Sequence, residues 1–342
     1  MTRHGEWIDK APRLAEVPVP RDTAAFDALL DAARPVVLRG LAADWPAVAA
    51  AGKGHGAMAA YLRGFDGGRP LGLFAGPPGI DGRFFYRDDM AGFNFERGQI
   101  PLPVLLDALQ KAADEAAPPA FYAGASAAKD HFPGWTRDNV LPLPTGDATA
   151  RLWIGNGSRV SAHFDMASNV AVVVAGRRRV VLFPPEQIAN LYIGPLDVTM
   201  AGQPATMVDI ERPDLNRFPR FAEAQRHAVV AELEPGDAIL IPTLWWHEIR
   251  ASGALNVLVN YWWTRGTPDA PFLALVHAIL AVRDRPAAER AALRTWFDHY
   301  VFGDDAPAVA DHLPAAARGV LGPPGAERDA RIRGYLRQML GG

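Results

Sequence analysis

Residues 158–183 read SRVSAHFDMASNVAVVVAGRRRVVLF, and this stretch decides the fold. Two runs with the composition of β-strands, VSAHFD and NVAVVVAG, are followed after a glycine by a third, RRVVLFPP. Further short runs bounded by Gly, Pro and Asp lie on either side: AFYAGAS, RLWIG, AVVAELEPGDAILIP and ALNVLVNYWW. Short strands with such regular turn punctuation are typical of antiparallel sandwiches and jelly rolls. We therefore predict a mainly β protein built on a jelly roll (double-stranded β-helix) with flanking helices.

The regions on both sides of this core have a different residue pattern. At residues 23–30, TAAFDALL has helical spacing, PVVLRG at 35–40 reads as a buried strand, and PLPVLLDALQKAA at 101–113 predicts a helix. Beyond residue 271 the sequence is helical throughout, and the Gly/Pro-rich region 64–82 predicts irregular structure. The expected organisation is an α/β N-terminal region (1–117), a jelly-roll core (118–268) and a C-terminal helical extension (269–342).

The amino-acid composition excludes several classes of function. Among 342 residues, 49% are hydrophobic and the formal net charge is −3, so no basic face for a nucleic-acid partner is expected. The sequence contains no cysteine, which leaves histidine and carboxylate as the ligands for any metal. The N-terminal residues lack the apolar segment of a secretory signal, and no run approaches the ~18 apolar residues of a membrane span. We expect a cytoplasmic protein without a membrane partner.

The triplet His163-Phe164-Asp165 is the strongest chemical signal. Residues i and i+2 of a strand point the same way, so the triplet offers two metal ligands on one face. A later strand follows the Pro-Gly-Asp turn at 235–237 and leads to His247, which is placed to supply a third. Two imidazoles and one carboxylate are the ligand set of non-haem Fe(II) oxygenases. A second triplet, His4-Gly5-Glu6, lies in a segment with no strand pattern and is set aside.

Residues 151–263 resemble the JmjC-type cupin hydroxylases, the asparaginyl hydroxylases among them. The resemblance rests on the joint occurrence of His-x-Asp, GRRRVVLFPP and PGDAILIPTLWWH. It implies a jelly roll that binds Fe(II) through His163, Asp165 and His247 and uses 2-oxoglutarate and O2 as co-substrates. It also implies that Asn169 and Asn260 line the co-substrate site.

The co-substrate site of these hydroxylases is matched with two departures. Tyr122 corresponds to a tyrosine that hydrogen-bonds the distal carboxylate of 2-oxoglutarate, but Arg178 stands where the family has a lysine for that carboxylate. An arginine can pair with it bidentately, and strand alternation turns Arg178 away from both neighbouring arginines. Val160 stands where the family commonly has Thr or Ser, so that contact is lost or moves to Ser161.

The resemblance implies hydroxylation of a C–H bond in a protein side chain, a peptide or a small molecule, with release of succinate and CO2. Two alternatives stay open. A cupin-type metal-binding isomerase or dioxygenase would use His-x-His and a following Glu, and Asp165 counts against it. The other alternative is a catalytically inactive jelly-roll binding module, in which Arg178 and Val160 would reflect the loss of oxygenase activity. The substrate is not coded in a readable motif.

The C-terminal helices carry an apolar stripe that includes Leu275, Ile279, Leu293, Trp296 and Tyr300. Such helices make homodimers in related hydroxylases. We therefore expect a homodimer formed through the C-terminal helices.

Overall fold

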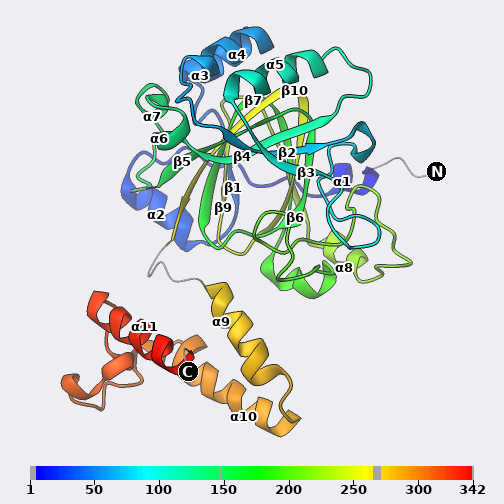
Figure 1. Cartoon of the computed structure of the whole chain (residues 1–342). Helices are drawn as coiled ribbons and strands as arrows, with labels where there is room; N and C mark the ends of the chain where they lie inside the picture. Colours follow the sequence, from blue (N-terminus) through cyan, green and yellow to red (C-terminus); the bar gives the residue numbers. More distant parts are fainter. Residues whose placement is uncertain (1–4, 147, 265–270, 341–342) are drawn as a thin grey trace. The chain divides into compact units, whose positions relative to one another are not determined.

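The structure is a computed structural model that describes residues 5–146, 148–264 and 271–340. The chain divides into two compact units, residues 1–263 and 264–342. The first unit contains a ten-stranded antiparallel sheet with helices packed on it, and the second is helical (Figure 1).

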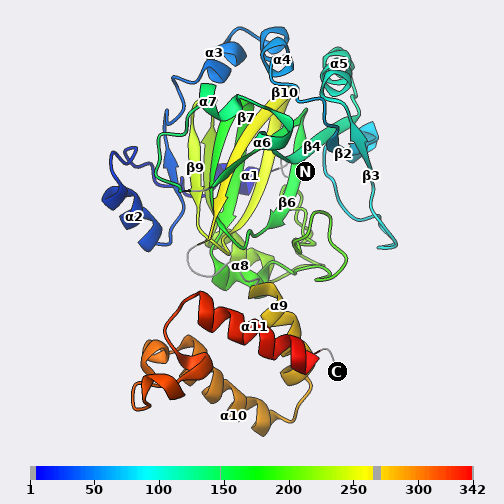
Figure 2. The same cartoon turned by 60° about the vertical axis from the view of Figure 1, so that its left-hand side comes forward.

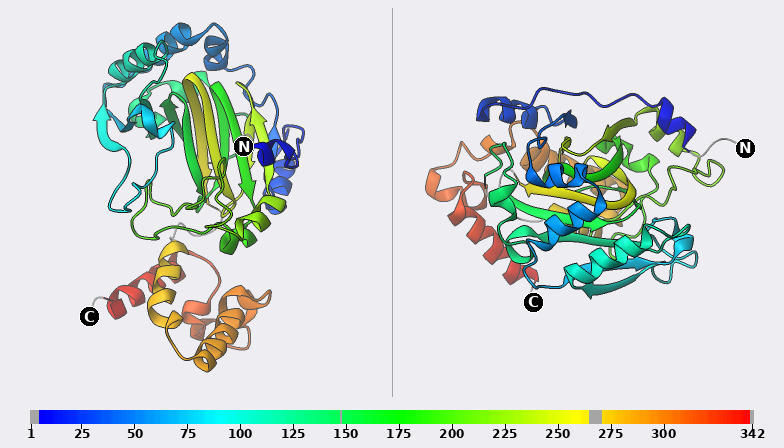
Figure 3. Two further views of the ribbon diagram at one scale, coloured as in Figure 1. Left: turned by 90° about the vertical axis from the view of Figure 1, so that its right-hand side faces the viewer. Right: turned by 90° about the horizontal axis from the view of Figure 1, so that it is seen from above.

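The sheet of the first unit is ordered β1-β9-β7-β10-β5-β4-β2-β3, with β8 beside β7 and β6 beside β10. The two central strands, β7 (Ser168–Phe183) and β10 (Trp246–Trp263), pair along most of their length and run side by side in Figure 3. The remaining strands are β1 (Val36–Leu38), β2 (Leu71–Gly76), β3 (Glu96–Ile100), β4 (Ala120–Ala127), β5 (Thr149–Gly155), β6 (Ser158–His163), β8 (Val229–Leu233) and β9 (Ala238–Ile241). This mainly β arrangement with flanking helices confirms the predicted fold class.

One difference from the prediction lies in β7, because the two runs on either side of Gly176 form a single strand. The register with β10 shifts at this point, and Gly176 has φ +74°. A Cβ there would meet Asn256 Oδ1 at 2.0 Å, so only glycine fits. The bulge lets one long strand continue past the close approach of Asn256.

Helices α2 to α7 contribute to one apolar cluster on one face of the sheet. They are α2 (Thr23–Asp31), α3 (Pro46–Gly52), α4 (His55–Arg63), α5 (Leu102–Ala112), α6 (Ala128–His131) and α7 (Trp135–Asp138). The first unit also contains α1 (Glu6–Lys10) and α8 (Phe221–Arg226). In Figures 1 and 2, α3, α4 and α5 lie together along the sheet. The amphipathic α5 buries Leu105 and Leu109 in the same cluster as Val172 of β7 and Val259 of β10. The predicted helices at 23–30 and 101–113 are confirmed.

The opposite face of the long strands forms the interior of the roll. A second apolar cluster there contains Ala171 and Val173 from the first half of β7 and Val180 and Leu182 from its second half. Because side chains alternate along a strand, Asn169 and Arg178 also face this interior. The roll interior is therefore apolar with a few polar side chains directed into it.

The region 64–82 was expected to be irregular, and this expectation is wrong. β2 lies inside it and pairs with both β3 and β4. Leu71 at the start of β2 is buried in the helix-covered cluster. Packing against long-range partners thus outweighs the local Gly and Pro content.

The second unit consists of α9 (Pro271–Ala278), α10 (Ala287–Phe297) and α11 (Ala326–Leu340), with π-helical turns at Ile279–Arg283 and Asp298–Phe302. Short 3-10 turns occupy Ala306–Ala308, Ala315–Ala317 and Gly319–Leu321, and in the first unit Pro78–Ile80 and Pro185–Asn190. No helix of the described ranges is long and apolar enough to cross a membrane.

Candidate metal and co-substrate site

Three side chains meet at one end of the roll, as the sequence predicts. His163 ends β6, Asp165 follows it after one residue, and His247 lies near the start of β10. His163 and His247 are direct cross-strand partners, and their ring centroids are 4.4 Å apart. The candidate ligand atoms of the three residues lie within 4.8 Å of one another. This compact set of two imidazoles and one carboxylate suits a divalent transition metal.

Both imidazoles are held with the same nitrogen free. His163 Nδ1 lies 3.0 Å from the carbonyl oxygen of Ser161, and His247 Nδ1 lies 3.0 Å from that of Trp245. A carbonyl only accepts, so each Nδ1 carries the proton and each Nε2 keeps its lone pair. Burial and the neighbouring His163 ring lower the pKa of His247. The buried imidazole is therefore neutral at neutral pH, which is the form that binds metals.

The carboxylate is oriented by two donors. Asn169 Nδ2 and Trp262 Nε1 each lie 3.2 Å from Asp165 Oδ2. Asn260 Nδ2 in turn donates to Asn169 Oδ1 at 2.6 Å. Hydrogen bonds thus connect Asn260 of β10 through Asn169 of β7 to Asp165. In metal sites, residues outside the ligand set orient the ligands through hydrogen bonds of this kind.

Arg178 is the most unusual side chain of the interior. It is 4% exposed, and its guanidinium donates to Asn256 Oδ1 and to the Arg177 carbonyl. Within the described residues it makes no ion pair with a carboxylate, and burial lowers the pKa of Arg178 to about 10. Its neighbours behave as alternation predicts, because Arg177 pairs with Glu234 and Arg179 with Glu232 on the outside. A buried cation without a counter-ion is costly unless an anion joins it.

Aromatic rings line the wall between Arg178 and the candidate metal ligands. Tyr122 interacts electrostatically with both Arg178 and Asp165, and burial raises the pKa of its hydroxyl. Its ring stacks on Trp153, whose own ring lies edge-on to Trp262. The chain passes tightly here, since a Cβ at position 124 would meet the Trp153 ring at 2.5 Å. The wall is thus built of flat, closely packed side chains.

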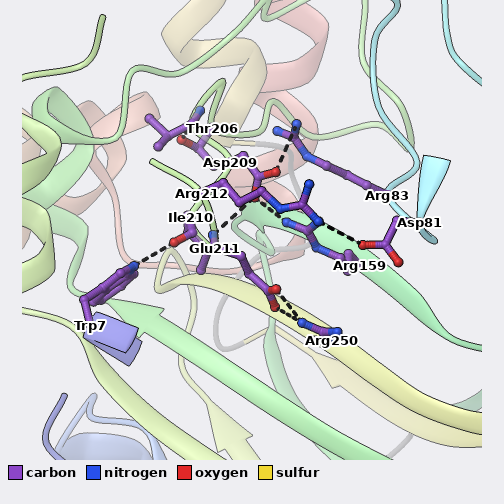
Figure 4. A network of polar contacts seen from close by, with 11 residues as sticks. Trp7, Asp81, Arg83, Arg159, Thr206, Asp209, Ile210, Glu211, Arg212 and Arg250 are labelled. Carbon is purple, nitrogen blue, oxygen red and sulfur yellow. Dashed lines mark hydrogen bonds and ion pairs between the residues drawn. The ribbon is translucent and has the colours of Figure 1, made fainter. Parts of the chain in front are cut away.

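A network of charged side chains fastens a loop beside the metal ligands. The loop backbone bridges His163 at Ala205, and the Thr206 amide donates to the Ala162 carbonyl. Farther along, Asp209 pairs with Arg159 of β6, and Glu211 pairs with Arg250 of β10 (Figure 4).

Other segments join the same network. Trp7 Nε1 donates to the Ile210 carbonyl at 2.7 Å, and Arg83 approaches Asp209 at 3.8 Å. Glu248 is buried beside these groups, and burial raises its pKa to about 8. The network therefore holds the loop 205–211 against both strands that carry histidine ligands.

The structure gathers most of the predicted site residues on one face. His163, Asp165, His247, Asn169, Asn260, Tyr122 and Arg178 all lie on the interior face of the roll. Ser161 is also buried, and its carbonyl oxygen holds the His163 ring. No hydrogen bond of its hydroxyl to the described residues accompanies this contact.

The four tryptophans of the TLWWH and NYWW segments divide between the site and the core. Trp262 holds Asp165, Trp246 packs against Phe164, and Trp263 packs against Phe26. Trp245 supplies the carbonyl for His247.

Sequence reasoning missed Asn256, Trp153 and Arg151. The sequence pattern could have indicated them. Asn256 and Asn260 are four residues apart on one strand, so both side chains lie on the same face as each other. Likewise, Leu152 and Ile154 are buried in the helix-covered cluster, which directs Arg151 and Trp153 into the roll.

Comparison with known proteins agrees with this geometry. The family described as "Cupin-like domain" matches residues 22–268. Human HSPB1-associated protein 1 is 38% identical over 114 residues, which is 32% of this chain and 22% of that protein. Lysine-specific demethylase JMJ31 of Arabidopsis thaliana is 33% identical over 117 residues, 34% of this chain and 21% of the relative. The tRNA wybutosine-synthesizing protein 5 of Danio rerio is 36% identical over 107 residues, 31% of this chain and 30% of the relative. The matched segment thus spans less than a third of each of these relatives.

Proposed function

Since the chain belongs to the cupin-like family of the JmjC type, we propose that it is an Fe(II)- and 2-oxoglutarate-dependent oxygenase. Its reaction would hydroxylate a C–H bond of a protein side chain, peptide or small molecule and release succinate and CO2. The family membership supports an enzyme of the oxygenase class, and the residues of this chain support the choice of co-substrate.

The observation that carries the proposal is the buried guanidinium of Arg178, which has no carboxylate partner among the described residues. It lies on the same interior face as the three candidate ligands, and Tyr122 interacts with both Arg178 and Asp165. The far carboxylate of a metal-chelating dicarboxylate is bound strongly by a cation and a hydroxyl donor. Arg178 and Tyr122 offer that pair. An inactive binding module gives no reason to retain a buried cation that lacks a counter-ion among the described residues.

The donor set fits Fe(II), which His163, Asp165 and His247 would hold. When bound there, Fe(II) supplies the oxidation by O2 that converts 2-oxoglutarate to succinate and CO2 and inserts oxygen into the substrate. The protein contributes the remaining functions. The Asn169 and Trp262 donors hold Asp165, the backbone carbonyls hold both imidazoles, and Arg178 anchors the far carboxylate. The stacked rings of Tyr122 and Trp153 shield this part of the roll interior from water.

The proposal is tested by following succinate formation from 2-oxoglutarate by NMR, with and without Fe(II) and O2. Slow uncoupled turnover that requires both is the expected result. An isomerase would need neither O2 nor an oxo-acid, and an inactive module would produce no succinate under any condition. The Asp165→Ala variant is the control for iron free in solution.

We also propose that the second unit forms a homodimer interface with another copy of the chain. Its helices expose large apolar side chains, among them Leu273, Leu280, Trp296, Val301, Phe302 and Met339. A helical unit that exposes so much apolar surface gains stability by association. Light scattering at micromolar concentration should give twice the chain mass, and Leu280→Arg combined with Phe302→Glu should give the monomer. A monomeric parent protein contradicts this part of the proposal.

A further inference from the structure

Arg151 of β5 points into the roll close to the metal ligands. Its neighbours Leu152 and Ile154 are buried against the helices, so alternation turns Arg151 to the opposite, interior face. Its guanidinium lies 5.7 Å from the centre of the Trp262 ring, and that indole holds Asp165 through its Nε1. Register also places Arg151 directly opposite Asn260 of β10.

The guanidinium is held in position but not neutralised. Nη1 donates to the Ala125 carbonyl at 3.2 Å, and no ion pair with a carboxylate is among its contacts with the described residues. Ala125 has φ +52° at a register shift between β4 and β5. A non-glycine residue in the left-handed region costs energy, and here the distortion turns a carbonyl toward Arg151. The side chain is partly exposed, which leaves its other donors open to a ligand.

Two residues next to Arg151 in the sheet each carry a buried polar atom that has no hydrogen-bond partner in the described part of the chain. These atoms are Trp153 Nε1, a donor two residues along β5, and Asn260 Oδ1, an acceptor on the facing strand. Asn260 is 3% exposed and already uses its amide nitrogen on Asn169. Buried unpaired polar atoms are rare and indicate a missing partner. We call Arg151, Trp153 and Asn260 the Arg151 patch.

We infer that the Arg151 patch binds a carboxylate or phosphate group of the primary substrate and so selects anionic substrates. The inference rests on the proposed oxygenase function, because it assigns this anion to the substrate rather than to 2-oxoglutarate. The two arginines lie at different positions along β10. Arg178 contacts Asn256, whereas Arg151 is paired with Asn260, which belongs to the hydrogen bonds that hold Asp165. Arg178 thus provides an anion site for the co-substrate, and Arg151 provides a separate anion site for the substrate. Arg151 and the indole N–H of Trp153 supply donors to the anion, and Asn260 Oδ1 accepts from a neighbouring hydroxyl or amide of the same molecule.

The test measures anion binding without metal or 2-oxoglutarate, so that it does not depend on oxygenase activity. The Arg178→Met protein serves as the background, because it removes the other interior arginine. Fluorine NMR titrations use trifluoroacetate, trifluoromethylphosphonate and the neutral trifluoroacetamide as probes. Arg151→Gln is compared with Arg151→Lys and with the control Arg97→Gln. Arg97 also donates to backbone carbonyls and lies 4.6 Å from the centre of the Phe93 ring, but on the exposed strand β3.

At least one anion should bind about tenfold or more tightly than the amide, as expected of a charge-assisted contact. Arg151→Gln should remove this preference, Arg151→Lys should keep part of it, and Arg97→Gln should leave it unchanged. The carboxylate and phosphonate arms then identify the anion. Equal binding of the neutral probe, or unchanged anion binding in a folded Arg151→Gln protein, overturns the inference. Loss of succinate formation with intact anion binding would instead contradict the proposed function alone.

Discussion

Replacing Arg178 by methionine should abolish tight binding of 2-oxoglutarate without unfolding the protein. Methionine keeps most of the side-chain length and apolar volume but removes the buried charge. Truncating one partner of a buried, hydrogen-bonded charge pair costs about 2–5 kcal/mol, which is roughly 30-fold to several thousand-fold in Kd. The same substitution relieves the ligand-free protein of a cation that has no counter-ion among the described residues.

The ligand-free protein should therefore lose little stability. Removing the desolvated charge is neutral or stabilising by about 1–4 kcal/mol, while Asn256 Oδ1, left without its donor, costs about 1–3 kcal/mol. The two effects nearly cancel. A variant that binds 2-oxoglutarate far more weakly at nearly unchanged stability separates a ligand-binding role from a purely structural one.

Isothermal titration calorimetry of 2-oxoglutarate into Mn(II)-loaded protein measures the affinity, and urea unfolding of the metal-free protein measures the stability. Arg177→Met is the matched control, because Arg177 is exposed and pairs with Glu234 outside the roll. Arg178→Lys should retain measurable binding. The reasoning is refuted if Arg178→Met binds 2-oxoglutarate as tightly as the parent, or if Arg177→Met weakens binding equally.

Three further changes probe the rest of the site. Asn169→Ala removes one of the two donors to Asp165 and should weaken Mn(II) or Fe(II) affinity about 10–100-fold, as measured by competition with a metal-binding dye. Asp209→Asn removes the nearer of the two carboxylates that pair with the buried Arg159 and leaves only Asp81, at 3.8 Å, so it should lower the unfolding free energy by about 3–5 kcal/mol in urea. In metal-free protein the pKa of His247 lies below its ordinary value, so the unfolded chain takes up a proton that the folded protein does not. Stability should then fall as the pH drops below about 6.5, and His247→Gln should flatten this dependence.

Each of these expectations has a result that contradicts it. Unchanged metal affinity in the Asn169 variant would mean that its hydrogen bond does not orient the carboxylate. An Asp209 variant of parental stability would show that water replaces the ion pair without cost. Equal acid sensitivity in the parent and the His247 variant would assign the pH dependence to other groups.

The ligand triplet could be predicted because its information is local. Alternation puts His163 and Asp165 on one face, and the strand after the Pro-Gly-Asp turn brings His247 alongside. The amphipathic α5 could be predicted for the same reason, since its apolar spacing is contained in eleven residues.

The parts that could not be predicted depend on contacts between distant residues. The continuity of β7 across Gly176 depends on Asn256, which lies eighty residues later and would collide with any side chain at that position. The ion pair of Arg159 with Asp209 likewise joins a strand to a loop with no recognisable motif. Arg151 was overlooked because its significance appears only when β5, β4 and β10 are placed side by side.

Anaerobic titration of the Fe(II)-loaded protein with 2-oxoglutarate tests the central claim most directly. The account predicts a weak visible charge-transfer band of a chelated Fe(II)–oxo-acid complex, which saturates with one equivalent of 2-oxoglutarate and is absent from the Asp165→Ala variant. A protein that binds Fe(II) but develops no band at any concentration of 2-oxoglutarate would contradict it.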